Sequence, residues 1–418
     1  MFFLTAEVGV AETMVRDLIL VGAGAYFKDL AAPSVRLMQQ RGAVGTFITV
    51  DTQPIDGSDL HVVREPQQPL SAVVDDLVAT GKTPERPLVL LAHPNHLHTP
   101  ESADLLKNAR SKPDVLIEKP YAITVEQMIY LDLLLDRHMG RVGTLEYYLT
   151  MKGVPLLLAG GVVRPGTFYW TEPVLKLRSD RTLDQIAGSL RESIGDPLYV
   201  VSDVLEGEGS YGTIAHRNSS LVDARQGGGM IQDLGHHALS PLLALQDYLG
   251  TLSLVDVRTA FCDTYERFAI ETFGIPPEHI GESFAKMRFT TDRDVDVDVA
   301  VGKYVENGTN QRRIVITGTR GVMIYDMTKN VLSIQRGDAV DKTVPLLEAD
   351  KSGAPKYYPV IRAAVDTMNG NNPFTFEPFD VAMDAQRYVF NILEDAQAEN
   401  HPRGRTHYRA GTMHDEIL

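Results

Sequence analysis

Cysteine is nearly absent from this sequence. Cys262 is the only cysteine among 418 residues. No disulfide can therefore form within the chain, and a metal site built from cysteine thiolates is excluded. A single cysteine suits a reducing compartment, and we expect the protein to be cytoplasmic.

Basic residues are also fewer than acidic residues. The chain has 40 lysines and arginines against 55 aspartates and glutamates, which gives a formal net charge of -15. Such a charge argues against binding to nucleic acid or to an anionic membrane surface. It leaves a small anionic ligand open, because a local basic pocket can exist in an acidic protein. No apolar run reaches transmembrane length. We therefore expect a small-molecule partner, with no nucleic acid and no membrane.

Residues 1–16 are expected to form an amino-terminal extension. They are mildly apolar, but they lack a basic start and are interrupted by Glu7 and Glu12, so a signal peptide is not predicted. The sequence has no internal repeat and no low-complexity segment. Its length favours two domains over one core. We predict a first domain over residues 17–148, a second over 149–400 and a tail over 401–418.

Short apolar runs alternate with helical segments in the first half of the chain. The clearest run, Asp17 to Val21, ends at Gly22. Strands are predicted over 17–21, 44–50, 87–92, 114–117 and 142–147, with helices near 30–40, 70–79, 99–109 and 124–137. Thr124 and Gln127 predict a capping box at the start of the last of these helices. This alternation predicts an α/β domain with a doubly wound parallel sheet.

The pattern changes in the second half. Segments 197–205, 282–290, 294–304, 313–317 and 322–325 are predicted strands, and 294–301 alternates strictly between aspartate or alanine and valine. Helices are predicted near 360–368 and 382–396. The second domain is therefore expected to be α+β, with an open, mainly antiparallel sheet. No linker rich in proline, glycine or serine separates the halves, so we expect the last helices to pack against the first domain.

The strongest chemical signal is the segment Gly228-Gly-Met-Ile-Gln-Asp233-Leu-Gly-His-His237. If this segment opens a helix, Asp233 and His237 are four residues apart and lie on one face. A carboxylate and an imidazole in one space can move a proton to or from a hydroxyl or carbonyl near neutral pH. The alternatives are a helix-start cap for Asp233 and a core histidine for His237. We expect the neighbouring His236 to be structural.

Two features predict a dinucleotide site in the first domain. Gly22-Ala-Gly24 follows the first strand, where glycines let the backbone approach a pyrophosphate. The fingerprint is incomplete, because Phe27 occupies the place of its third glycine. Asp51 ends the second strand, where a carboxylate can bind an adenosine ribose and repel a 2′-phosphate, so NAD is favoured over NADP. The alternatives are an ordinary strand–helix turn and a surface aspartate.

Two other segments follow predicted strands. His93, His96 and His98 are close in sequence, but no carboxylate joins them at ligand spacing, so no metal is predicted. Lys119, in Glu118-Lys-Pro120, can donate to a substrate hydroxyl and stabilise a developing alkoxide. Its alternative is a solvated surface lysine.

These motifs in this order resemble the family of glucose–fructose oxidoreductase, inositol dehydrogenase and rhizopine-catabolism (Gfo/Idh/MocA) proteins. The resemblance covers residues 18–249 and rests on five short motifs, which are Gly22-x-Gly24, Asp51, Pro94-Asn95-x-x-His98, Glu118-Lys119-Pro120, and Gly228-Gly229 with Asp233-x-Gly235-x-His237. It implies a Rossmann domain followed by an α+β domain whose open sheet makes contacts in a dimer or tetramer.

The resemblance also implies roles for individual residues. Lys119 would contact the reacting hydroxyl, Asp233 would orient substrate, and His237 would be the acid and base. Glu118 would contact a cofactor ribose, and Asn95 and His98 would line the nicotinamide. Pro94 and Lys119 are also predicted to bind the cofactor. The implied reaction is hydride transfer between a nicotinamide cofactor and a carbon of a sugar, sugar derivative or cyclitol. A regulator that senses dinucleotides without catalysis and an NAD-dependent glycosidase are the alternatives.

The sequence departs from the family pattern in places that affect the substrate. Ser240 stands where an acidic residue is common, and residues 153–196 are longer than usual. Tyr148 and Lys152 are candidate substrate-binding residues near the mouth of the expected site. Arg217 and Arg225 precede the Asp233 segment, and the cations could hold a phosphate or nucleotide on the substrate. Ordinary solvated or structural use of these side chains is the alternative.

Overall fold

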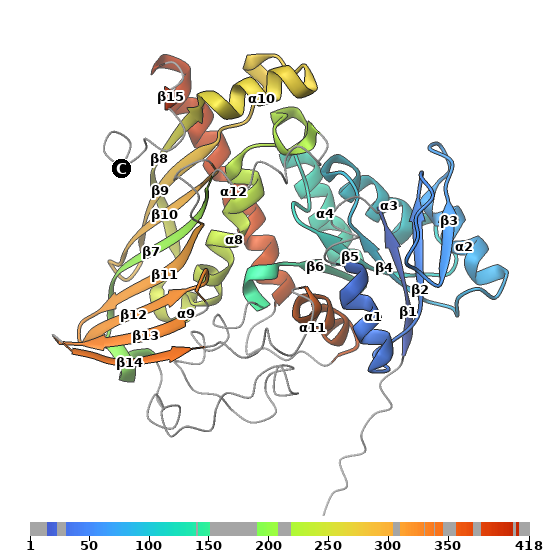
Figure 1. Ribbon diagram of the computed structural model, residues 1–418, viewed down its shortest axis with the longest axis horizontal. Helices are drawn as coiled ribbons and strands as arrows, with labels where there is room; N and C mark the ends of the chain where they lie inside the picture. Colours follow the sequence, from blue (N-terminus) through green and yellow to red (C-terminus); the bar gives the residue numbers. More distant parts are fainter. Residues whose placement is uncertain are drawn as a thin grey trace, which may run out of the picture.

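The computed structural model describes residues 15–22, 31–138, 141–150, 190–207, 219–303, 310–329, 331–337, 339–345, 357–370, 378–403 and 407–408. These residues form two β-sheets with helices between and around them (Figure 1). Gly24, Phe27, Lys152 and Arg217, together with most of the long segment 153–196, lie outside the described residues. The domain boundaries at 16, 148 and 400 stay predictions.

The first sheet has six parallel strands in the order β3-β2-β1-β4-β5-β6. The strands are β1 (Arg16–Val21), β2 (Val44–Asp51), β3 (Leu60–Val63), β4 (Leu88–Leu91), β5 (Asp114–Glu118) and β6 (Val142–Leu145). This order confirms the predicted Rossmann sheet. It reverses direction between β1 and β4, and ligands bind such sheets beyond the carboxyl ends of the strands at this point.

Helices cover both faces of this sheet because its strands are apolar on both sides. Leu18 and Leu20 of β1 pack against α1 (Ala32–Gln40) and α11 (Tyr358–Met368). Ile19 and Val21 belong to the core on the opposite face, which includes α2 (Leu70–Ala79), α3 (His98–Asn108) and α4 (Val125–Arg137). The alternation of side chains along one strand therefore builds two separate cores.

The predicted cap of α4 is present with one difference. The Thr124 hydroxyl accepts a hydrogen bond from the backbone N–H of Gln127 at 3.2 Å. The Gln127 side chain accepts from the backbone N–H of Ile123 at 3.0 Å, one residue before the capping residue. The helix start is thus fixed from both sides, as a capping box requires.

The second sheet has nine strands in the order β14-β13-β12-β11-β7-β10-β9-β8-β15. It is mainly antiparallel, as predicted, but β7 pairs with β10 and β8 with β15 in parallel. The strands are β7 (Pro197–Glu206), β8 (Leu252–Cys262), β9 (Phe284–Thr291), β10 (Asp296–Lys303), β11 (Gln311–Gly318), β12 (Gly321–Asp326), β13 (Val331–Arg336), β14 (Ala339–Pro345) and β15 (His407–Tyr408).

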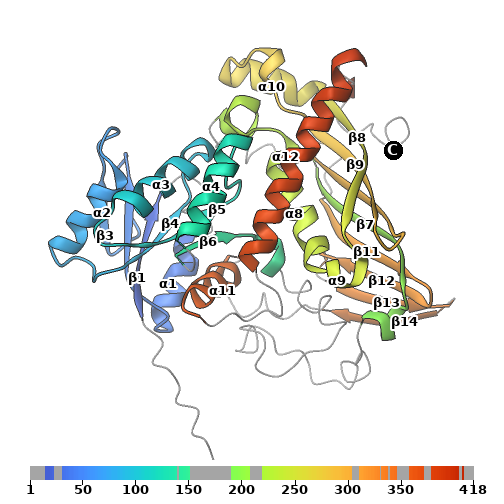
Figure 2. The ribbon, with the colours of Figure 1, turned by 180° about the vertical axis from the view of Figure 1, so that it is seen from behind.

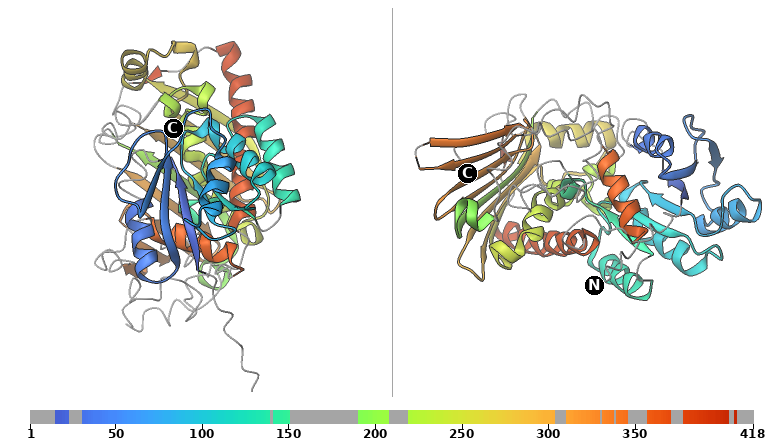
Figure 3. Two further views of the ribbon diagram at one scale, coloured as in Figure 1. Left: turned by 90° about the vertical axis from the view of Figure 1, so that its right-hand side faces the viewer. Right: turned by 90° about the horizontal axis from the view of Figure 1, so that it is seen from below.

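Two helices lie between the sheets. These two helices are α8 (Met230–Ala244) and α12 (Pro378–Arg403). The short α9 (Gln246–Leu249) follows α8. Views from behind and from below show α8 and α12 side by side between the two sheets (Figures 2 and 3). α12 contacts α8, β8 and β6, while α11 contacts α1 and β6, which confirms that the last helices return to the first domain.

The described part of the chain also contains α6 (Leu190–Ile194) and α10 (Asp263–Phe273). None of the helices in this part is long and apolar enough to cross a membrane.

Candidate active site

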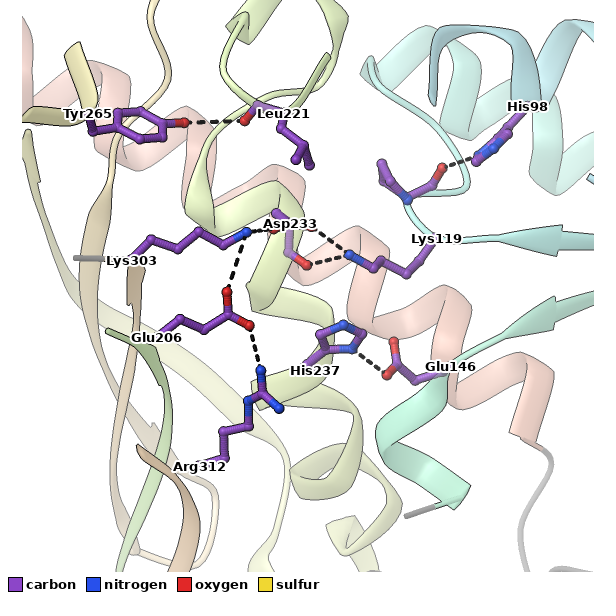
Figure 4. A network of polar contacts seen from close by, with 11 residues as sticks. His98, Lys119, Glu146, Glu206, Leu221, Asp233, His237, Tyr265, Lys303 and Arg312 are labelled. Carbon is purple, nitrogen blue, oxygen red and sulfur yellow. Dashed lines mark hydrogen bonds and ion pairs between the residues drawn. The ribbon is translucent and has the colours of Figure 1, made fainter. Parts of the chain in front are cut away.

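The candidate site lies where the carboxyl ends of β5 and β6 face α8. Lys119 follows β5, Glu146 follows β6, and Asp233 and His237 lie one turn apart on α8. Figure 4 shows Lys119 pointing toward Asp233, and Glu146 toward His237. The structure therefore brings the three predicted catalytic residues together from segments more than a hundred positions apart.

Glycines let the first turn of α8 fit tightly into the second domain. Gly229 has a φ of 113°, and a Cβ there would lie 2.7 Å from a carboxylate oxygen of Glu282. Because glycine offers no capping side chain, Glu282 takes this role: its carboxylate accepts from the Ile231 N–H at 2.7 Å. Burial raises the pKa of Glu282 to about 7. The helix is thus capped by a residue that the sequence analysis did not single out.

Lys119 is not a solvated surface lysine. Its side chain is 12% exposed. The ammonium donates to Oδ1 of Asp233 and to the Asp233 backbone carbonyl, both at 2.7 Å. The alternative reading of Asp233 as a helix cap is also wrong, because its carboxylate bonds with side chains of other elements.

The second oxygen of Asp233 binds a lysine that the sequence analysis missed. Lys303 of β10 donates to Oδ2 of Asp233 at 2.7 Å, and its side chain is 5% exposed. Lys303 also lies 3.5 Å from Glu206, which in turn binds Arg312 at 2.5 Å. Period-two alternation could have found Lys303, since it falls on the same face of β10 as the buried Val297, Val299 and Val301.

His237 is held by a carboxylate that was also missed. Its Nδ1 lies 2.7 Å from Oε1 of Glu146, and both side chains are buried. An ionised carboxylate only accepts, so Nδ1 carries the proton and Nε2 is the basic nitrogen of the neutral ring. Tyr148, a candidate substrate residue, stacks on the His237 ring with centroids 4.2 Å apart. Glu146 comes directly after β6, just as Glu118 ends β5. A carboxylate at the end of a parallel strand was the feature by which the sequence could have indicated Glu146.

The charge states of this pair suit proton transfer. Burial lowers the pKa of His237, although the Glu146 carboxylate acts in the opposite direction. Burial alone would raise the pKa of Glu146, but the charge and hydrogen bond of His237 lower it overall. Near neutral pH, Glu146 is therefore ionised and His237 is ready to accept a proton.

Several predicted cofactor residues lie at the carboxyl ends of the first sheet. Gly22 follows β1 with a φ of 88°, and a Cβ there would lie 2.6 Å from Cα of His93, so only glycine allows this approach. Asp51 ends β2, and its carboxylate accepts from the Gln53 N–H at 3.0 Å. Pro94 and Asn95 follow β4, and the Asn95 amide lies close to Gly227, in the loop before α8. Glu118 ends β5.

His98 is turned inward. Its ring is buried, with Nδ1 2.7 Å from the Pro120 carbonyl and Nε2 2.9 Å from the His93 carbonyl. Burial lowers the pKa of His98 to about 3, so the ring is neutral and donates to one of these carbonyls at a time. These contacts give His98 an indirect role, in which it fixes the segment after Lys119 against the loop after β4. A direct contact with nicotinamide stays a prediction.

Contacts to neighbouring residues are shown for three further side chains near the site, His236, His93 and Arg225. His236 is buried, and its ring meets Tyr121 edge-on with centroids 5.5 Å apart. His93 faces Glu101 at 3.3 Å. Arg225 binds Asp223 at 2.8 Å, which is a structural use. Within the ranges that the structure describes, no three histidine, cysteine or acidic side chains are grouped to hold a metal ion.

No family model and no curated protein sequence matches this chain. Solved structures do match its fold. Levoglucosan dehydrogenase in complex with NADH and L-sorbose has a TM-score of 0.63 at 14% identity, over 92% of this chain and 97% of that chain. The chain has the fold of that oxidoreductase.

Two further solved structures extend the comparison. An oxidoreductase from Agrobacterium radiobacter in complex with NAD+, L-tartaric acid and magnesium also has a TM-score of 0.63 at 14% identity, with coverage of 92% and 97%. Biliverdin reductase from Synechocystis, in complex with biliverdin and NADP+, has a TM-score of 0.60 at 16% identity, with coverage of 91% and 99%. At such identities the likeness concerns the fold.

Proposed function

We propose that this protein is an oxidoreductase of the Gfo/Idh/MocA type. It transfers a hydride between a nicotinamide cofactor and a secondary alcohol or ketone carbon of a sugar, sugar derivative or cyclitol. The observation that carries the proposal is the convergence of Lys119, Asp233 and His237, with the basic Nε2 of His237 left by its bond to Glu146. Solved structures of the same fold contain NADH with a sugar, which supports this choice.

The residues at the first sheet fit a dinucleotide. The close approach of Gly22 to the loop after β4 leaves no room for a side chain, as in a turn over which a pyrophosphate lies. Gly24, Pro94, Asn95 and Glu118 are the further proposed contacts. A bound nicotinamide would supply the hydride acceptor or donor.

Each polar residue has a distinct proposed role in the oxidative direction. His237 Nε2 takes the proton from the substrate hydroxyl as the carbon loses its hydride. The ammonium of Lys119 stabilises the negative charge that develops on that oxygen. Asp233 holds Lys119 in place, and Glu146 fixes the His237 ring. In reduction, His237 returns the proton to the carbonyl oxygen.

We propose NAD as the cofactor on the basis of Asp51 and its surroundings. A carboxylate at the end of β2 accepts hydrogen bonds from a ribose and repels a 2′-phosphate. Arg64 follows β3 next to Asp51, but its guanidinium is committed to Glu101 through two contacts of 2.8 Å. This commitment favours a ribose without phosphate.

Asp51→Ala is expected to weaken NAD binding by about tenfold, because a charged group that accepts a ribose hydrogen bond is lost. NADP binding should change less or improve, since the repulsion of the 2′-phosphate is relieved. Titration of both dinucleotides, followed by protein fluorescence, measures the two affinities. Asp76→Ala, at an exposed position on α2, is the control. Equal weakening of both dinucleotides would remove Asp51 from the ribose site.

Glu146→Gln is expected to shift the acid limb of the kcat/KM profile to lower pH. Oxidation requires neutral His237, so kcat/KM falls as pH drops through the pKa of His237. The carboxylate stabilises the imidazolium, and its removal lowers that pKa further. The amide also no longer selects the Nδ1–H tautomer, so the maximal rate should drop by at least about tenfold. The surface variant Glu126→Gln should leave the profile in place. An acid limb that moves upward would contradict the assigned pairing.

The direct test of the function is a panel of sugars, sugar phosphates, nucleotide sugars and cyclitols with NAD or NADP. Formation of reduced nicotinamide with at least one compound is expected. A dinucleotide-sensing regulator would bind the cofactor without sustained turnover. A glycosidase would return the cofactor to its starting redox state and release a sugar. Failure to bind either dinucleotide would refute the proposed function.

A further inference from the structure

Asp233 is shared by two lysines from opposite domains. Lys119 comes from the end of β5 in the first sheet, and Lys303 from the end of β10 in the second. Each ammonium lies 2.7 Å from its own oxygen of the Asp233 carboxylate. The three side chains are 12%, 5% and 7% exposed for Lys119, Lys303 and Asp233. Two like charges therefore lie close together in a poorly solvated place.

Lys303 also lies near a second carboxylate, that of Glu206. Glu206, directly opposite Lys303 in the pairing of β7 with β10, lies 3.5 Å from its ammonium. Glu206 in turn forms an ion pair with Arg312. Positive and negative groups thus alternate from Lys119 to Arg312, as Figure 4 shows. Without Lys303, each carboxylate would still keep one cation, so a neutral side chain at this position is compatible with folding.

We propose that Lys303 is a positioning residue that neutralises Asp233 from the second sheet, so that the ammonium of Lys119 can turn to the reacting oxygen of the substrate. The inference rests on the proposed function for its catalytic meaning. A lone lysine beside a buried carboxylate is held strongly, since the attraction is large where solvent is scarce. Repulsion between Lys303 and Lys119 offsets part of that attraction. The geometry thus assigns Lys303 a role in catalysis without contact with the substrate.

The first arm of the test needs no turnover. The rate at which acetic anhydride acetylates Lys119 at fixed pH is measured by mass spectrometry of peptides, with the exposed Lys82 as internal reference. Only the uncharged amine reacts. Lys303→Met removes a neighbouring positive charge. This removal stabilises the charged form of Lys119, so the acetylation of Lys119 should slow by about 3–10-fold. Unchanged or faster acetylation would overturn the proposal.

Two matched variants control for structural damage. Lys303→Gln keeps a donor toward Asp233 but lacks charge, so it should slow the acetylation of Lys119 as Lys303→Met does. Arg312→Met leaves both lysines on Asp233 and should change the rate by less than about twofold. A loss of thermal stability common to all three variants, with no difference between them in acetylation, would also overturn the proposal.

The second arm is a double-mutant cycle on kcat/KM. Lys303→Met should lower kcat/KM by about tenfold in the wild-type background and by less than about threefold in an Asp233→Asn background, because Lys303 acts through Asp233. Equal losses in both backgrounds would overturn the proposal. If the wild-type protein turns over no compound of the panel, the proposed function fails, while the acetylation of Lys119 still decides whether Lys303 sets its charge state.

Discussion

His237→Ala is expected to lower turnover by about 10²–10⁴-fold, the loss typical of a missing general acid or base. His237 lies one turn from Asp233 on α8, and its bond to Glu146 leaves Nε2 without a proton. Glu146 orients the ring but is too deeply buried to replace it. Steady-state assays with the best substrate of the panel measure the effect.

Cofactor binding separates this loss from misfolding. His237 belongs to α8, whereas the proposed dinucleotide contacts lie at the ends of β1, β2, β4 and β5. We therefore expect the dissociation constant for NADH to stay within about twofold in the variant, since His237 is not one of these proposed contacts. His138→Ala, at the end of α4, is the control and should retain full turnover. A comparable loss of NADH binding in His237→Ala would show that the residue is structural.

Lys119→Met is expected to lower kcat by about 10²–10³-fold, as does the removal of one donor to a developing oxyanion. Asp233 keeps Lys303 in this variant, so no carboxylate is left without a cation and the protein should fold. The effect should fall mainly on kcat, because the charge on the substrate oxygen develops during the reaction. Separate measurement of kcat and KM checks this.

Lys119→Arg provides a sharper comparison than Lys119→Met alone. Arginine keeps the charge but is longer and planar, so it should restore folding interactions with Asp233 without restoring the geometry at the substrate oxygen. We expect it to remain at least about tenfold below the wild type in kcat. A raised KM with an unchanged kcat in Lys119→Met would mean that this lysine binds the substrate without stabilising the reacting oxygen.

The sequence predicted the first sheet well because its strands are buried on both faces. Continuous apolar runs such as Leu18 to Val21 are typical of parallel strands between helices. β3 was missed because it has four residues and none is fully buried. β8 was missed for another reason: a register shift between Leu254 and Asp256 breaks the two-residue alternation on which the prediction depends.

The candidate site was predictable where its residues share one segment. Asp233 and His237 lie four positions apart on one helix, so a pattern in ten residues was sufficient. Local pattern could mark Glu146 and Lys303 as candidates but could not assign their roles, because these depend on how β6 and β10 meet α8. Asp233 and Lys303 are 70 positions apart. The inward orientation of His98 likewise depends on the distant carbonyl of Pro120.

The most direct test of hydride transfer uses a substrate that carries deuterium on the reacting carbon. After incubation with NAD, the reduced cofactor is isolated and analysed by mass spectrometry. Our account predicts that the deuterium is found in the reduced nicotinamide, because the hydride moves from carbon to cofactor without exchange with solvent. Deuterium that appears only in water, with the cofactor unchanged, would contradict the account and favour proton abstraction without net oxidation.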